Sequence, residues 1–113
     1  MLGLGTDIIE ISRIARNLDK AAFVRRVYTE QEEAYWRARG VCAAESAAGL
    51  FCAKEAIVKA LGTGFNLPIR SVEIGHDALG RPYVISPKGR FLLSISHCKE
   101  YATATAILLE EPR

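Results

Sequence analysis

The longest element that the sequence predicts is residues 43–62, AAESAAGLFCAKEAIVKALG. This stretch is rich in alanine, lacks proline and ends at a glycine, which together favour a helix with a glycine stop. Apolar side chains recur along it at helical spacing and predict one apolar face, formed by Leu50, Phe51, Ile57, Val58 and Leu61. The same spacing groups other residues on a second face: Cys52, Glu55, Lys59 and Gly62. Several chemistry-bearing groups therefore share one side of a long amphipathic helix.

Shorter elements are expected ahead of this helix. Residues 1–6 are apolar and interrupted by glycine, which predicts an opening strand. Residues 8–18 carry apolar side chains at helical spacing, which predicts a first short helix. Thr29 and Glu32 form a capping-box pattern, so we expect a second helix to begin there and to stop near Gly40.

After Pro68, the helical spacing of apolar residues gives way to short β-rich stretches. Turn signals separate the β-rich stretches that follow, at residues 71–75, 81–86, 92–97 and 101–109. The last of these stretches has small side chains on one face, at Ala102, Ala104 and Ala106, where a helix could pack closely. Helices followed by strands predict an α+β fold with an antiparallel sheet. We therefore expect a single domain over residues 1–113, with an N-terminal strand and helices and the long central helix packed on the sheet.

Composition and charge disfavour several classes of protein. The chain has 113 residues, 50% of them hydrophobic, which suits one soluble globular domain. Its net charge of +2 disfavours a nucleic-acid-binding domain. Three cysteines without CxxC spacing indicate neither disulfides nor a zinc site, and so predict a reducing, cytoplasmic setting. There is no signal-peptide pattern and no apolar run near the roughly 20 residues that span a bilayer, so no membrane partner is expected.

Taken alone, the chemistry-bearing residues also have structural interpretations. Glu55 and Lys59 lie one helical turn apart and could form an exposed ion pair. Asp7 falls between the opening strand and the next helix, and could be that helix's N-cap. His97 ends an apolar strand and could make one structural hydrogen bond. Residues 62–64 could simply stop the long helix; because they follow a helix, they are not a Walker or Rossmann phosphate loop, which precedes one.

The combination of three segments favours a functional interpretation. Residues 3–14, GLGTDIIEISRI, closely resemble the N-terminal signature of the holo-acyl-carrier-protein synthase family of 4′-phosphopantetheinyl transferases. Residues 51–64, FCAKEAIVKALGTG, resemble the second signature of that family, and residues 94–97, SISH, resemble a third, weaker one. The resemblance implies the 4′-phosphopantetheinyl transferase fold, a homotrimer with active sites at the subunit interfaces, and transfer of 4′-phosphopantetheine from coenzyme A to a serine of an apo-acyl-carrier protein. That carrier could belong to fatty-acid, polyketide or peptide synthesis.

The resemblance also implies a role for each matched residue. Asp7 and Glu55 match the family's Mg²⁺-binding acids, and Mg²⁺ commonly takes only one or two protein carboxylates. Lys59 matches a lysine that contacts coenzyme A phosphate and stabilises charge on the transferring group. Asp7, Glu55 and Lys59 are therefore the expected catalytic residues. The other coenzyme A-binding residues that the resemblance implies are Gly62, Thr63, Gly64, Ser96 and His97.

A docking surface for the carrier protein is implied as well. The carrier is acidic along the helix that follows its modified serine, so the synthase should offer basic residues beside apolar ones. Arg13 matches a family arginine of this kind, and its pairing with Glu10 is the structural alternative. Phe23 and Phe51 are the expected apolar neighbours of Arg13. Three more arginines could contribute or be ordinary surface residues: Arg16, Arg25 and Arg26.

The chain departs from the family pattern at a few positions. Leu50 stands where many relatives have an arginine, and Ala21 and Ala22 stand where many have basic residues. Substrate affinity or carrier preference could therefore differ from the family norm. A non-catalytic carrier-binding module of the same fold is the alternative from a different class, and the presence of both metal-binding acids disfavours it.

Overall fold

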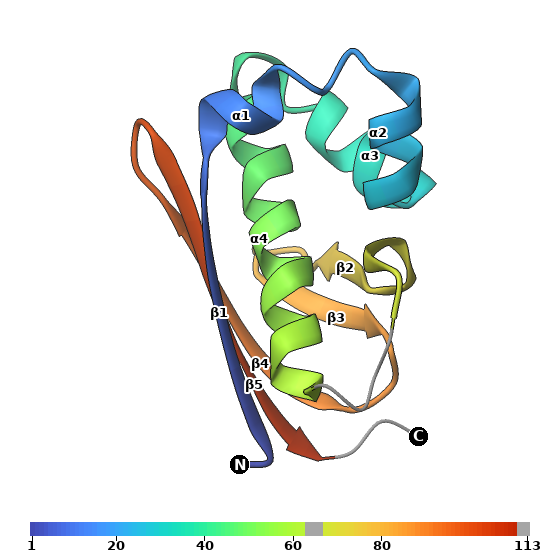
Figure 1. Cartoon of the computed structure of the whole chain (residues 1–113), viewed down its shortest axis with the longest axis vertical. Helices are drawn as coiled ribbons and strands as arrows, with labels where there is room; N and C mark the ends of the chain where they lie inside the picture. Colours follow the sequence, from blue (N-terminus) through green and yellow to red (C-terminus); the bar gives the residue numbers. More distant parts are fainter. Residues whose placement is uncertain (63–66, 111–113) are drawn as a thin grey trace.

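The computed structural model describes residues 1–62 and 67–110. Its longest helix, α4 (Ala43–Leu61), packs against a three-stranded antiparallel sheet (Figure 1). The strands of this sheet lie in the order β1 (Gly3–Glu10), β5 (Tyr101–Glu110) and β4 (Arg90–His97). A separate two-stranded antiparallel sheet is formed by β2 (Glu73–His76) and β3 (Pro82–Ser86). The arrangement confirms the predicted α+β class, with the long helix on an antiparallel sheet.

Short helices gather around the N-terminal end of α4 (Figure 1). They are α1 (Ile11–Ala15), α2 (Ala21–Val27) and α3 (Glu30–Arg37), followed by the 3₁₀ turn η1 (Gly40–Cys42). A second 3₁₀ turn, η2 (Ile69–Ser71), lies next to β2 instead. The predicted capping box opens α3: the Thr29 side chain accepts from the Glu32 backbone N–H, and the Glu32 carboxylate accepts from the Thr29 N–H at 2.8 Å. Helix α2 was not predicted. Among the helices that the structure describes, none is both long and apolar enough to cross a membrane.

The predicted first helix over residues 8–18 is wrong at its start. Strand β1 continues to Glu10, and α1 begins only at Ile11. The reason is tertiary, because every residue of β1 pairs with one of β5, from Gly3 with Leu108 to Glu10 with Tyr101. Asp7 therefore lies inside a strand, and the N-cap interpretation of this residue is also wrong.

Small residues bring α4 and β1 unusually close together. A Cβ built on Gly5 would lie 1.9 Å from the Ala56 carbonyl oxygen, and one on Gly3 would lie 1.9 Å from the Ala60 carbonyl oxygen. The predicted small-residue face of β5 is also buried, at Ala102, Ala104 and Ala106. Because side chains alternate along a strand, Asp7 shares a face of β1 with Gly5. The close contact at Gly3 and Gly5 thus places Asp7 next to α4.

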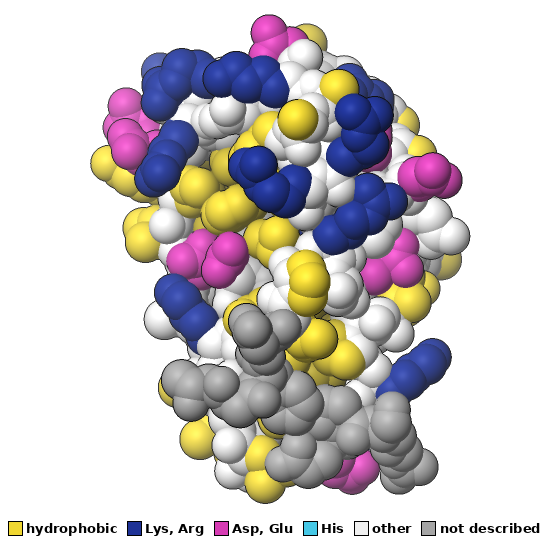
Figure 2. Space-filling model, turned by 45° about the vertical axis from the view of Figure 1, so that its right-hand side comes forward, with side chains coloured by type: hydrophobic (Ala, Val, Ile, Leu, Met, Phe, Trp, Pro, Cys, Tyr) yellow, Lys and Arg dark blue, Asp and Glu magenta, His cyan; other side chains and the backbone are white. Residues whose placement is uncertain are grey.

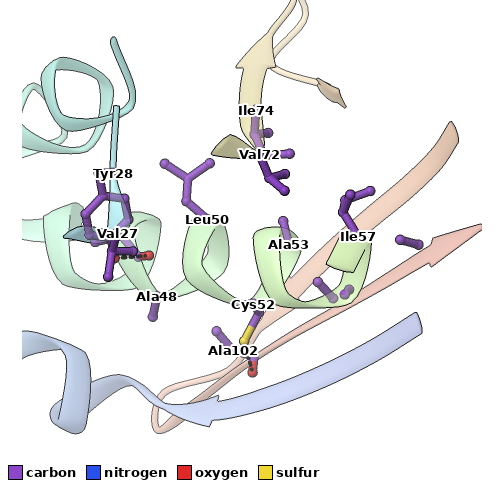
Figure 3. Packing of buried hydrophobic residues seen from close by; sticks show 14 of the residues in the cluster. Val27, Tyr28, Ala48, Leu50, Cys52, Ala53, Ile57, Val72, Ile74 and Ala102 are labelled. Atoms are coloured by element: carbon purple, nitrogen blue, oxygen red, sulfur yellow. Dashed lines mark hydrogen bonds between the residues drawn. The ribbon is translucent and has the colours of Figure 1, made fainter. Parts of the chain in front are cut away.

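The apolar core continues on the side of α4 that faces away from the three-stranded sheet (Figure 3). There Leu50, Ala53 and Ile57 face Val72 and Ile74, and all of these side chains are buried. Helix α4 is consequently buried on two sides rather than on the single apolar face that the spacing predicts. Glu55 and Lys59 lie outside these two buried sides, on a part of the α4 surface that remains accessible.

Candidate active site

A cleft of about 590 Å³ is lined by residues of β1, α1, α2 and α4. Residues that the sequence analysis predicted for two different tasks line this one cleft: Asp7, Arg13, Phe23, Phe51 and Glu55. Lysine and arginine side chains gather over the half of the molecule where the short helices lie, with hydrophobic side chains between them (Figure 2). The fold therefore brings the predicted metal-binding acids beside the predicted carrier-docking residues.

Lys59 reaches from α4 to β1. Its Nζ lies 3.2 Å from Asp7 Oδ1 and donates to the Thr6 carbonyl oxygen at 3.0 Å. Within residues 1–62 and 67–110 there is no ion pair between Glu55 and Lys59, so the expected exposed pair along the helix does not form. Lys59 does not line the cleft itself, but its side chain is 52% exposed, which leaves the ammonium accessible to an anion beside Asp7.

The carboxylates of Asp7 and Glu55 influence one another. Burial raises the pKa of Glu55, the negative charge of Asp7 raises it further, and Lys59 opposes both effects. Two carboxylates in mutual repulsion at a cleft suit a divalent cation, because hard cations prefer carboxylate oxygens. The described part of the chain has no group of three or more His, Cys, Asp or Glu that could hold a metal. A cation here would therefore complete its shell with water or substrate oxygens.

Cys52 lies beneath these acids and was not predicted to have any part in the site. Its thiol is fully buried and donates to the Ala102 carbonyl oxygen at 3.3 Å. Burial, followed by the charge of Asp7, raises the pKa of Cys52 to about 12. The thiol therefore stays neutral and serves as packing rather than as a nucleophile or metal ligand.

His97 lies away from this cleft. It lines a second cavity of about 250 Å³, together with Leu50, Tyr35 and Arg39. Its Nδ1 is 3.6 Å from Glu45 Oε2, a contact that becomes an ion pair when the imidazole is protonated. One chain thus does not bring His97 and the two acids into one cleft.

The other predicted coenzyme A-binding residues are spread along the chain. Ser96 is exposed on β4, and Gly62 ends α4 with a φ of +84°, a left-handed value that favours glycine. The helix-stop interpretation of Gly62 is therefore confirmed, and it leaves a binding role open. Thr63 and Gly64 lie outside the described residues.

The arginines differ in how they relate to the cleft. Arg13 and Glu10 both line it, and no ion pair joins them in the part of the chain that the structure describes. Arg26 lines it too, with its guanidinium carbon 5.8 Å from the centre of the Phe23 ring. Arg25 and Arg16 are exposed and do not line the cleft. Of the three arginines left open by the sequence, Arg26 is therefore the one that lines the cleft.

Comparisons with known proteins place these motifs in a family context. The family model of the 4′-phosphopantetheinyl transferase superfamily matches residues 3–106. The holo-[acyl-carrier-protein] synthase of Protochlamydia amoebophila is 50% identical, over 94% of this chain and 96% of the relative. The synthase of the same name from Fusobacterium nucleatum is 40% identical, over 96% of this chain and 99% of the relative.

Solved structures are similar over the same extent. A holo-(acyl-carrier-protein) synthase from Bacillus anthracis in complex with CoA (3′,5′-ADP) has a TM-score of 0.85 and 40% identity, with 97% of each chain covered. The Helicobacter pylori holo-[acyl-carrier-protein] synthase in complex with coenzyme A has a TM-score of 0.82 and 26% identity, over 94% of this chain and 99% of that one. The similarity therefore extends to nearly every element described above.

Proposed function

The chain belongs to the 4′-phosphopantetheinyl transferase superfamily, and we propose that it transfers the 4′-phosphopantetheine group from coenzyme A to a serine of an apo-acyl-carrier protein. The products are the holo-carrier and adenosine 3′,5′-bisphosphate. One observation carries the proposal: a single cleft combines two repelling carboxylates with basic and aromatic side chains. Identity of 40–50% to holo-[acyl-carrier-protein] synthases over nearly the whole chain supports it.

Magnesium is the cofactor that we propose for this cleft, held by Asp7 and Glu55. When bound, Mg²⁺ neutralises charge on the diphosphate of coenzyme A during transfer. Lys59 adds a second positive charge, since its exposed ammonium lies beside Asp7 and can turn to a phosphate oxygen. A cation held by Asp7 and Glu55 would also offset the repulsion between these two carboxylates.

The mouth of the cleft suits an acidic protein partner. Arg13 and Arg26 supply positive charge there, while Phe23 and Phe51 supply apolar contact area. Charge complementarity of this kind mainly accelerates encounter, whereas buried aromatic contacts slow dissociation. A carrier whose modified serine precedes an acidic helix would thus place that serine near Asp7 and Glu55.

A homotrimer with shared active sites would unite the cleft with the cavity of His97. The sheet face turned away from α4 carries apolar side chains in register, because Ile107 pairs with both Leu4 and Leu92. Leu4 and Leu92 are 57% and 55% exposed, so this face is available to a second copy of the chain. We expect the His97 cavity of one subunit to meet the Asp7 cleft of its neighbour.

Mass spectrometry of the carrier tests the proposed activity. The protein is incubated with coenzyme A and a panel of apo-carriers, with Mg²⁺ in one arm and excess chelator in the other. A carrier that gains the mass of phosphopantetheine only in the Mg²⁺ arm is the expected result. Carrier binding without any gain in mass would favour the non-catalytic module, and full activity in chelator would refute the metal role.

Subunit mixing tests the shared site. Asp7→Asn and His97→Ala variants should each be inactive alone, but trimers reassembled from equal amounts should regain about one quarter of the wild-type sites, because each site takes one residue from each neighbour. His97→Ala that keeps full activity by itself, or a mixture that stays inactive, would contradict this arrangement.

A further inference from the structure

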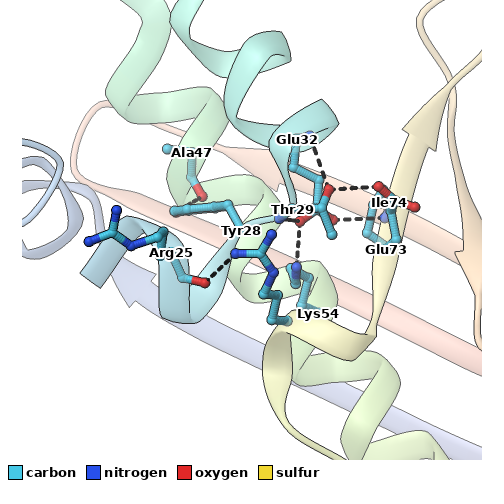
Figure 4. A network of polar contacts seen from close by, with 9 residues as sticks. Arg25, Tyr28, Thr29, Glu32, Ala47, Lys54, Glu73 and Ile74 are labelled. Atoms are coloured by element: carbon cyan, nitrogen blue, oxygen red, sulfur yellow. Dashed lines mark hydrogen bonds and ion pairs between the residues drawn. The ribbon is translucent and has the colours of Figure 1, made fainter. Parts of the chain in front are cut away.

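A carboxylate and an ammonium are buried together in the core, outside the cleft. Glu32 on α3 is 1% exposed and Lys54 on α4 is 0% exposed. Glu32 Oε1 accepts hydrogen bonds from Lys54 Nζ and from the Thr29 backbone N–H, and Glu32 Oε2 accepts from the Ile74 N–H at 2.8 Å (Figure 4). One carboxylate therefore joins the start of α3, the middle of α4 and strand β2.

The network extends further without reaching the substrate-facing surface. The Thr29 hydroxyl donates to Glu73 Oε2 at 2.6 Å, and Lys54 Nζ lies 6.0 Å from the centre of the Tyr28 ring. Burial lowers the pKa of Lys54, and the charge of Glu32 opposes that shift. Neither Lys54 nor Glu32 lines the cleft. Direct contact of this pair with coenzyme A or carrier at the cleft is therefore not part of its role.

The opposite side of α4 packs on the sheet mainly through small residues. There Gly3 and Gly5 contact the α4 backbone directly, and β5 contributes the small side chains of Ala102, Ala104 and Ala106 together with Leu108. Two side chains of α4, Cys52 and Lys59, donate to carbonyl oxygens of the sheet. Smooth surfaces of this kind allow close approach, but they lack the interlocking side chains that select one rotation. A buried, directional ion pair can supply that selection.

We infer that Lys54 and Glu32 are positioning residues, which fix the rotation of α4 about its axis and so hold Glu55, the next residue, toward Asp7 across the cleft. The inference rests on the proposed role of Asp7 and Glu55. A helix with its side chains is about 10–12 Å across, so a rotation of about 10° moves the outer end of Glu55 by about 1 Å. A misplacement of that size can reduce turnover about 100-fold.

Lys54→Met tests the inference, because it retains the length of the side chain and removes the charge. We expect kcat per folded molecule to fall about 10- to 100-fold and the Mg²⁺ concentration for half-maximal activity to rise, while KM for the carrier changes less than about twofold. Val72→Ala is the matched control, since Val72 is equally buried in the adjoining apolar core. It should lower the melting temperature without changing kcat per folded molecule or the Mg²⁺ requirement.

A double variant protects the test against misfolding. Lys54→Met alone leaves the Glu32 charge buried without its cation, whereas Glu32→Gln with Lys54→Met leaves no buried charge. The double variant should fold and show the same loss of kcat. If either folded variant matches Val72→Ala in kcat and Mg²⁺ requirement, the pair only stabilises the fold. Wild-type turnover in excess chelator would instead refute the metal proposal, and kcat per folded molecule would still decide the positioning role.

Discussion

Gly5→Ala is the sharpest test of how the fold builds the cleft. The added Cβ would lie 1.9 Å from the Ala56 carbonyl oxygen and 2.8 Å from the Ala60 nitrogen. Both neighbours are backbone atoms of α4, so neither can rotate away. Ordinary contact needs about 3.4 Å, so β1 and α4 must separate by about 1.5 Å.

This separation should affect both stability and turnover. Overpacking of this kind typically costs about 1–3 kcal/mol, which lowers the melting temperature of a domain of this size by about 5–15 °C. Asp7 lies two residues beyond Gly5 on the same strand face, so it moves away from Glu55 when β1 shifts. A displacement above 1 Å between these two acids should reduce kcat per folded molecule by about 100-fold.

Thermal melts and steady-state kinetics on Gly5→Ala and Gly75→Ala measure these effects. Gly75→Ala is the matched control, because its Cβ would meet only the ends of two side chains, Tyr83 at 2.8 Å and Ile85 at 2.9 Å, rather than backbone atoms, and Tyr83 is half exposed. The control should melt within a few degrees of the wild type and keep its kcat. The reasoning fails if Gly5→Ala behaves like Gly75→Ala, because the close approach of β1 would then not set the geometry of the acids.

Two further substitutions probe the charges of the cleft. Glu55→Gln should abolish turnover yet stabilise the metal-free protein at pH 7. The raised pKa of Glu55 means that the folded protein binds the carboxyl proton more tightly than the unfolded chain does. Wild-type stability therefore declines as the pH rises from 4.5, the ordinary pKa of the carboxyl group, through its pKa in the folded protein. Melting temperatures of the two proteins should converge below that window, and parallel curves at every pH would contradict this account. Arg13→Glu should raise KM for an acidic carrier, most of all at low salt, and leave KM for coenzyme A near wild type. Arg16→Glu, the same charge change outside the cleft, should do neither, and an equal effect of both variants would remove Arg13 from the docking surface.

Local patterns were enough to predict much of the fold. The long helix, the capping box at Thr29 and the alanine face of β5 each depend on residues within a few positions of one another. The start of the first helix was wrong because Ile8 suits a helix by its spacing from Ile11, while its pairing with Thr103 of β5 depends on a residue more than 90 positions away. Helix α2 lacks a side-chain N-cap, so its start had no local signal.

Sequence patterns proposed residues for the site but could not give their contacts. Family-like motifs pointed to Asp7, Glu55 and Lys59, yet the Lys59 contact with Asp7 spans 52 positions and replaces the helical pair that spacing favoured. The ion pair of Glu32 and Lys54 was missed for a related reason. Charged residues in a helix are usually solvated, and only the packing of α3 and β2 over α4 buries these two together.

Two neighbouring residues of α4, Lys54 and Glu55, differ in whether an opposite charge balances their own. Lys54 is fully buried, and its positive charge is paired with the carboxylate of Glu32, which also accepts two backbone hydrogen bonds. Glu55 faces the charge of Asp7, and only Lys59 opposes the resulting rise in its pKa. If the cleft served stability alone, a second cation would be expected beside these acids, since an uncompensated pair destabilises the folded state. Instead, Asp7 and Glu55 together carry more negative charge than Lys59 offsets, at a cleft that a ligand can reach, which is the arrangement expected for the divalent cation that we propose.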